Sequence, residues 1–334
     1  MTSFLRKSLP FLGFAFLGAA GVCAWKMRAP SAPASVQVVE PSKPKSSSRP
    51  RSSRPQLAYL NDPGQPWQVR IELLRQALSE ECGEPEIREL YHFMAKGAPE
   101  GELPEHGYVI ANEIMEQLLR HDPNPQRFSS SLLEVLHDSA QPLVVRDYAI
   151  QHLVTWLTLH PPKAQKESPD SSHLSSTAPS PEITAHVFQS LVVAATNPEL
   201  EQTTIPGTTL MMFINLARQP GGVDFSEATE TLKPWLSRAL EDGSILSTPI
   251  RVSAIQAAGI LDPEEFRPVI RNIAYAENGQ SSLRLSSIAV LGQCGETADL
   301  EKLRHIASAH PELSYAAQEA ITSLTSRLAQ GNSN

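Results

Sequence analysis

Ten histidines and three cysteines are the residues of this chain that could bind a transition metal. A metalloprotease-type site needs two histidines one turn apart on a helix, as in HExxH, and the sequence has no such motif. His305 and His310 are five residues apart, which turns the two side chains to different faces of a helix. The sequence therefore predicts no metal site and no cofactor.

Motifs for phosphate binding and for nucleophilic catalysis are also missing. The sequence has no GxxxxGK[ST] loop, no GxGxxG turn and no GxSxG nucleophile elbow. Cys82 and Cys294 are far apart in the sequence, and we expect them to be small buried apolar groups rather than a redox pair. We therefore expect no catalytic residues and no enzymatic activity.

Charge divides the chain into two unlike parts. Residues 1–56 carry nine Lys and Arg and one Glu, whereas residues 57–334 carry 19 Lys and Arg and 35 Asp and Glu. An acidic body of this kind repels the phosphates of DNA and RNA. A nucleic-acid partner is therefore not expected.

The elements that would position any site are helices throughout. Apolar residues recur at intervals of three and four, as in Val145, Ala149, Leu153 and Trp156, and no segment alternates as a strand does. Prolines fall where helices are expected to begin. The pattern predicts an all-α fold with helices at 67–82, 85–96, 105–121, 125–137, 142–160, 182–196, 206–218, 225–241, 249–261, 263–277, 282–293, 297–309 and 313–329.

The C-terminal third repeats with a fixed period. A shift of 33 residues places Gly259 on Gly292 and Arg251 on Arg284, and it aligns the apolar positions of the surrounding helices. A period in this range is typical of stacked helix pairs, each of which buries its apolar face only against its neighbours. The alignment predicts that five isoleucines are buried: Ile255, Ile273, Ile288, Ile306 and Ile321.

The repeated segments resemble a known family. IRVSAIQAAG at 250–259 and LRLSSIAVLG at 283–292 resemble the first helix of a HEAT repeat, especially the short bilin-lyase-like kind. VRDYAIQHL at 145–153 is a fainter copy. The resemblance is clearest over 249–329 and implies an α–α superhelix, a HEAT-like solenoid of about six helix pairs plus a capping helix. HEAT-like hydroxylases bind iron through His-Glu dipeptides, which this chain lacks.

The resemblance also indicates a candidate binding face. In HEAT arrays the second helix of each pair lines the concave side, which would place helices 263–277 and 297–309 on the inner face. Basic residues there stand out on an acidic domain, and a carboxylate-bearing peptide would gain charge-assisted hydrogen bonds from them. The candidate partner-binding residues are Arg267, Arg271, Lys302 and Arg304. A solvated face with local ion pairs remains the alternative.

Two stretches rich in Pro and Ser interrupt the helical pattern. Residues 29–65 combine Pro, Ser and basic residues and are predicted to form a disordered linker. Residues 161–181 are too long for an ordinary connection and are predicted to be a disordered insertion in the array. The repeat domain is therefore expected to span residues 66–330.

The first 28 residues read as a membrane signal. The apolar run from Leu9 to Trp25 is long enough for a short spanning helix, and charged residues flank it on both sides. We favour an uncleaved single-pass anchor at residues 9–25 over a cleaved signal peptide. Lipidation at Cys23 is disfavoured, because Val22 is too large for the usual lipobox. The positive-inside rule favours a cytoplasmic repeat domain, but the short N-terminus and the spacer favour the extracytoplasmic side, which we prefer.

Together these features predict a membrane-tethered scaffold that binds a protein or peptide without catalysing a reaction. The alternative is an enzyme or enzyme subunit whose site is assembled from scattered residues on the concave face of the solenoid.

The anchor gives the first testable prediction. Full-length protein should sediment with membranes and resist extraction by alkaline carbonate, because residues 9–25 span the bilayer. A chain that starts near Gln56 should stay in the supernatant. Recovery of a mature protein that begins at Gly21 or Trp25 would replace the anchor with a cleaved signal.

Overall fold

The computed structural model describes residues 57–80, 82–96, 103–160, 179–219, 226–241 and 243–331. The expected anchor, the linker before residue 57 and nearly all of the expected insertion at 161–181 lie outside these residues. No helix among the described residues is both long and apolar enough to cross a membrane.

The described chain is wholly helical, with thirteen α-helices, two short 3-10 helices and no strand in those residues. This confirms the all-α prediction, and most expected ends lie within one or two residues of the observed ones. The helices are η2 (Leu57–Asn61), α2 (Trp67–Glu80), α3 (Glu84–Lys96), α4 (Pro104–His121), α5 (Pro125–His137), α6 (Leu143–Leu159), α7 (Pro181–Thr196), η3 (Pro198–Leu200), α8 (Ile205–Ala217), α9 (Ser226–Leu240), α10 (Thr248–Leu261), α11 (Pro263–Tyr275), α12 (Ser281–Cys294), α13 (Asp299–Ala309) and α14 (Pro311–Gly331).

Local sequence accounts for the ends of these helices. Proline occupies the first turn of α4, α5, α7, α10 and α11, where its missing N–H has no partner to lose. Side chains cap several of the same ends. Asn124 accepts a hydrogen bond from the Arg127 backbone N–H at 3.0 Å, and Asp262 accepts one from the Glu265 N–H at 3.2 Å.

The ordered array begins earlier than the boundary expected at residue 66. Leu57 and Leu60 in η2 are each 1% exposed, and η2 packs against α2 and α3. These two leucines anchor the segment to α2 and α3, although the composition of the surrounding sequence, which is rich in Pro, predicted a disordered linker.

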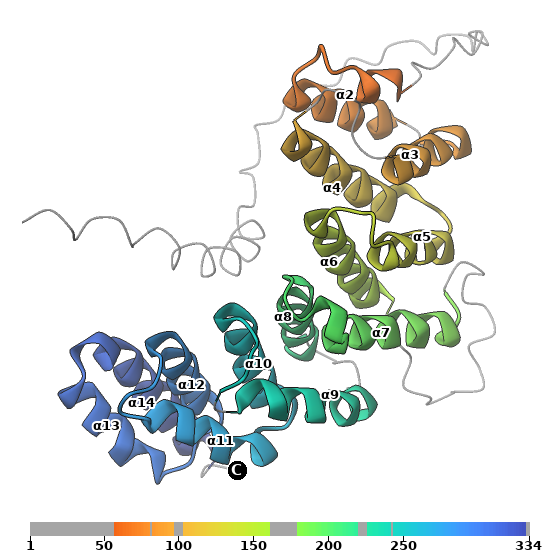
Figure 1. The fold of residues 1–334 in the computed structure, drawn as a ribbon. Helices are drawn as coiled ribbons and strands as arrows, with labels where there is room; N and C mark the ends of the chain where they lie inside the picture. The colour runs from red at the N-terminus through yellow and green to blue at the C-terminus, as the bar shows by residue number, and fades with distance from the viewer. Residues whose placement is uncertain are drawn as a thin grey trace, which may run out of the picture. The chain divides into compact units, whose positions relative to one another are not determined.

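The helices form two layers (Figure 1). The even-numbered helices α2 to α14, the first helix of each pair, pack extensively on one another in chain order. The odd-numbered helices α3 to α13, the second helix of each pair, touch one another only sparsely. Successive repeats are therefore closest on the first-helix side and diverge on the second-helix side. The HEAT resemblance implied the second helices on the concave side, and these contacts favour the opposite arrangement.

Glycine permits the close approach of the first helices. A Cβ at Gly292 would lie 2.8 Å from the Cα of Ala320 in α14, and one at Gly259 would overlap Val290 in α12. Any larger residue would force the helices apart at these crossings. This explains why the period of 33 residues preserves glycine at both positions.

An arginine at the fourth position of a first helix joins each such helix to the preceding element. Arg146 Nε donates to the Leu136 carbonyl at the end of α5 at 2.8 Å, and Arg284 Nε donates to the Ala274 carbonyl near the end of α11 at 3.3 Å. Arg251 donates to Ala239 and Glu241 at 3.0 and 2.8 Å, and Arg70 donates to Leu60 at 3.0 Å. The last carbonyls of a helix have no intrahelical donor, so these guanidinium groups cap them.

The predicted core is confirmed for three of the five isoleucines, since Ile255, Ile288 and Ile306 are at most 4% exposed. It is wrong for the other two, which are only partly buried. Ile321 lies in α14, and no later helix of the described chain covers it. Ile273 lines a cleft beside α9.

The arginine cap gives a test of the array. Arg284→Met should lower the free energy of unfolding by about 1–3 kcal/mol, because the buried Ala274 carbonyl and the part-buried Glu277 carbonyl lose their donor. The measurement is denaturant unfolding followed by circular dichroism. The control is Arg304→Met on the exposed surface of α13, which should change stability by less than about 0.5 kcal/mol. Equal effects of the two changes would contradict the cap.

Candidate functional site

Described residues form three clefts, and two of them lie between successive second helices. The largest, the α9–α11 cleft, has a volume of about 600 Å³. The α3–α5 cleft has about 410 Å³, and a third cleft of about 250 Å³, the Glu201–Arg238 cleft, is lined by Glu201, by Arg238 of α9 and by the residues that follow α9. The α3–α5 and α9–α11 clefts are therefore local hollows between second helices on the loosely packed side of the array.

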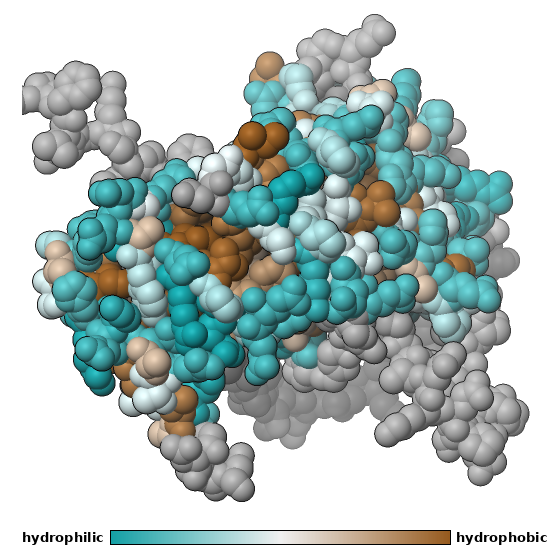
Figure 2. Space-filling view, turned by 60° about the horizontal axis from the view of Figure 1, so that its bottom comes forward, coloured by the Kyte–Doolittle hydropathy of each residue, from teal (hydrophilic) through white to brown (hydrophobic). Residues whose placement is uncertain are grey.

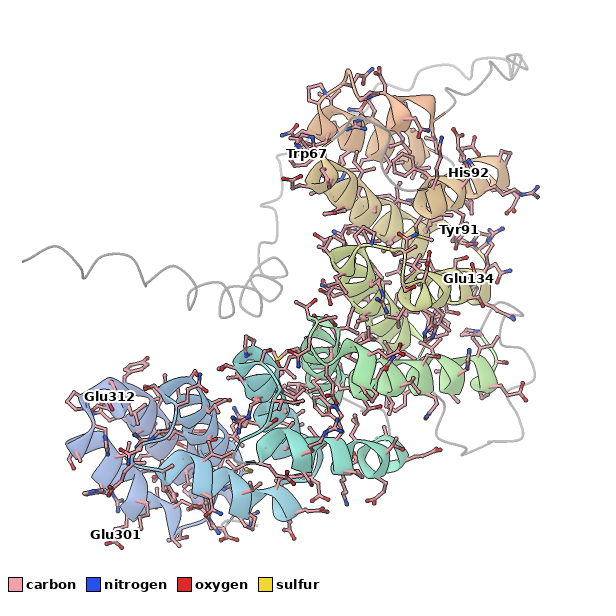
Figure 3. The ribbon with its side chains drawn as sticks, in the orientation of Figure 1. Trp67, Tyr91, His92, Glu134, Glu301 and Glu312 are labelled. Carbon is pink, nitrogen blue, oxygen red and sulfur yellow. The ribbon has the colours of Figure 1, made fainter. Side chains whose placement is uncertain are left out.

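The α3–α5 cleft combines an apolar floor with a polar rim. Met94 of α3 and Val135 of α5 are 4% and 5% exposed and lie at its base. Tyr91 and His92 line it from α3, and Glu134 lines it from α5 (Figure 3). All of these side chains project from helices, whose backbones fix the position of each group.

Tyr91 is held firmly in this cleft. Its hydroxyl donates a hydrogen bond of 2.6 Å to the Asp122 carboxylate, and the Arg127 guanidinium lies 5.5 Å from its ring centroid. Burial, followed by the bond to Asp122, raises the pKa of Tyr91 far above its usual value. The phenol therefore stays neutral, and its orientation is set before any ligand arrives.

Arg127 organises the wall behind Tyr91 without lining the cleft. It donates to Asp122 Oδ1 at 2.7 Å and to Glu84 Oε1 at 2.6 Å, and so joins α3 to the α4–α5 turn and α5. Hydrogen bonds from Arg127 and Arg88 lower the pKa of Glu84 to about 2. The guanidinium of Arg127 is occupied by Glu84 and Asp122, and the cleft is lined by other side chains.

The charged side chains that line the α3–α5 cleft include carboxylates and no Lys or Arg. Glu134 and Asp138 are its two carboxylates, and no Lys or Arg lines it. Asp138 accepts hydrogen bonds from the Ala140 N–H at 2.9 Å and the Gln141 side chain at 3.4 Å, neither of which neutralises its charge. Glu134 is exposed and has no ion pair among the described residues. The cleft therefore presents a negative potential.

The other two clefts are chemically different. The Glu201–Arg238 cleft contains an internal ion pair between these two residues. In the α9–α11 cleft, Arg251 is engaged with backbone carbonyls, and the remaining polar lining is largely the neutral amides of Asn272, Asn278 and Gln280. Glu241 also lines both of these clefts, and an arginine lines each of them, whereas the α3–α5 cleft is lined by two carboxylates and by no Lys or Arg.

The four basic residues predicted to bind a partner lie in two different environments. Arg271 forms a bidentate pair with Asp299 at 2.7 and 2.8 Å, and Arg267 donates to Glu296 at 2.6 Å. These bonds connect α11 to Glu296 in the turn before α13 and to Asp299, the first residue of α13. Lys302 and Arg304 are exposed on α13 and have no ion pair among the described residues.

Apolar side chains also reach the surface in scattered places. Figure 2 shows that the face it presents is largely hydrophilic, with apolar groups in separate patches. Trp156 and Trp235, which could have anchored a partner, are instead buried at 1% and 5% exposure. Tyr91 is the aromatic side chain that lines the α3–α5 cleft.

No described group of three or more His, Cys, Asp and Glu side chains could hold a metal ion. The histidine with the largest pKa shift, His152 in α6, is an isolated partner of Asn112 in α4. Its Nε2–H donates to Asn112 Oδ1 at 3.0 Å, because that oxygen can only accept. Burial lowers the pKa of His152 to about 4.

Comparison with models of known protein families and with curated proteins gave no match to this sequence.

The buried His152 predicts a pH dependence of stability. The unfolded chain binds a proton at a pKa near 6.5 and the folded chain only near 4, so stability falls as pH falls through this range. Between pH 6.5 and 4.5 the wild type should lose about 2 kcal/mol more than His152→Gln. Denaturant unfolding at a series of pH values measures the difference. His92→Gln, a change at an exposed position, should follow the wild-type profile. Parallel profiles for His152→Gln and wild type would contradict the assignment.

Proposed function

We propose that this chain is a membrane-tethered helical-repeat scaffold that binds a protein or peptide partner and does not itself catalyse a reaction. Support comes first from the architecture, because stacked helix pairs offer a long, regular surface to an extended ligand. The HEAT-like character of that array is part of the proposal and rests on the repeated sequence at 250–259 and 283–292.

The observation that carries the proposal is the α3–α5 cleft. A binding surface needs apolar area for affinity and oriented polar groups for specificity, and both are present on rigid helices. Tyr91 is already fixed by Asp122 and Arg127, so a ligand would lose little affinity to ordering it.

The tether and its side of the membrane rest on sequence alone. The apolar run at residues 9–25 supplies the anchor in this proposal, and residues 29–56 supply a Pro- and Ser-rich spacer. On this basis the repeat domain is placed on the extracytoplasmic side.

Site-specific photo-crosslinking in cells that produce the full-length protein tests the proposal. A benzophenone amino acid in place of Ala95 or Ala276, exposed residues that line the α3–α5 and α9–α11 clefts, should give an adduct of one defined mass. The matched control is the same substitution at Ala289, which is exposed on the first helix α12. Adducts of equal yield at Ala289, or none at either cleft, would contradict a scaffold that uses this side.

A further inference from the structure

We infer that the α3–α5 cleft binds an extended segment of the partner that carries a Lys or Arg next to an apolar side chain. This inference rests on the proposed function and names the chemistry of the partner.

The size of the cleft suits a short stretch of peptide. Its volume of about 410 Å³ lies within the range of small-ligand sites, and it is open along the sides of two helices rather than enclosed. An extended segment can therefore insert a few side chains while its backbone continues past both ends of the cleft.

The floor explains the apolar part of the segment. Met94 and Val135 are almost fully buried yet line the cleft, so a hydrophobic side chain placed over them would remove their remaining area from water. Methionine adapts its shape to different apolar partners, so the floor does not demand one particular side chain.

The rim explains the basic part. Glu134 lies in the last turn of α5 and Asp138 is the C-cap residue that follows this helix, and both line the cleft. With no Lys or Arg in the lining, two like charges here are destabilising for the free protein and complementary to a cation. The aliphatic stem of a Lys or Arg would pack along Tyr91 while its charged end reaches the carboxylates.

The same groups disfavour other ligands. A phosphate- or carboxylate-rich segment would bring negative charge against Glu134 and Asp138 without a nearby cation to compensate. A purely apolar segment would cover both carboxylates without a partner, which costs free energy. A segment with one basic and one apolar side chain is complementary both to the apolar floor of Met94 and Val135 and to the carboxylates of Glu134 and Asp138.

The test uses fluorescence anisotropy with the full-length protein in lipid nanodiscs. The probe is a labelled ten-residue peptide of alternating Lys and Leu, and the comparison is the same peptide with Glu in place of Lys. We expect the Lys peptide to bind at least tenfold more tightly, with affinity that falls as salt rises. Equal binding of the two peptides overturns the inference.

Three variants locate the binding. The double change Glu134→Gln and Asp138→Asn should weaken the Lys peptide at least tenfold. A matched double change of exposed acids elsewhere, Glu182→Gln and Glu264→Gln, should leave affinity within twofold of wild type. Ala95→Trp should also abolish binding, because it fills the cleft from an exposed position without removing charge. Melting by circular dichroism checks that each variant folds, and an equal loss in both double variants overturns the inference.

Two further measurements distinguish this inference from the proposed function and test whether the chain's own basic segment occupies the cleft. If the Lys peptide does not bind but crosslinks still form at Ala276, the inference is wrong and the proposed scaffold function stands. A full-length chain with its basic segment neutralised to Gln should bind the Lys peptide as wild type does. A large gain in affinity there would make that segment the occupant and overturn a partner-derived one. The neutralised residues are Lys43, Lys45, Arg49, Arg51 and Arg54.

Discussion

The array depends on an arginine that joins four of its seven first helices, α2, α6, α10 and α12, to the element before each, and that is buried in three of these four copies. Arg146 and Arg284 are 7% and 4% exposed, and each gives its guanidinium to the last carbonyls of the preceding second helix. Removing a cation from water is costly unless strong acceptors replace the lost hydration. The carboxyl end of a helix supplies such acceptors, because its carbonyls are unpaired and its dipole is negative. The same bond therefore satisfies both groups and fixes how one pair follows the next.

The clefts follow from how the repeats are stacked. Glycine at 259 and 292 lets the first helices approach until backbone and side chain touch, while the second helices lack a comparable contact and diverge. Where the first helices of successive pairs pack closely, the second helices of those pairs are further apart. The α3–α5 and α9–α11 clefts lie on the open side, so their position is set by packing on the opposite layer.

Sequence reasoning recovered what depends on neighbours along the chain and missed what depends on neighbours in space. Helix ends were predictable because proline and capping side chains act within one turn, as at Pro125 and Asp262. The burial of Ile288 followed from the repeat. The ion pairs of Arg271 with Asp299 and of Arg127 with Glu84 join residues that are 28 and 43 positions apart, and no local pattern marks them. The α3–α5 cleft had no signal for the same reason, since it is defined by the spacing of two helices.

The internal use of arginine also shapes the chemistry of the surface. Capping employs Arg70, Arg146, Arg251 and Arg284, and pairing with carboxylates employs Arg127, Arg267 and Arg271. Residues 57–334 hold 19 basic groups against 35 acidic ones, so these internal roles leave the outer field dominated by carboxylates. A field of one sign speeds the approach of oppositely charged partners and repels like-charged ones. Under the proposed function this acidic field is complementary to a cationic partner, and Glu134 and Asp138 add two carboxylates at the α3–α5 cleft.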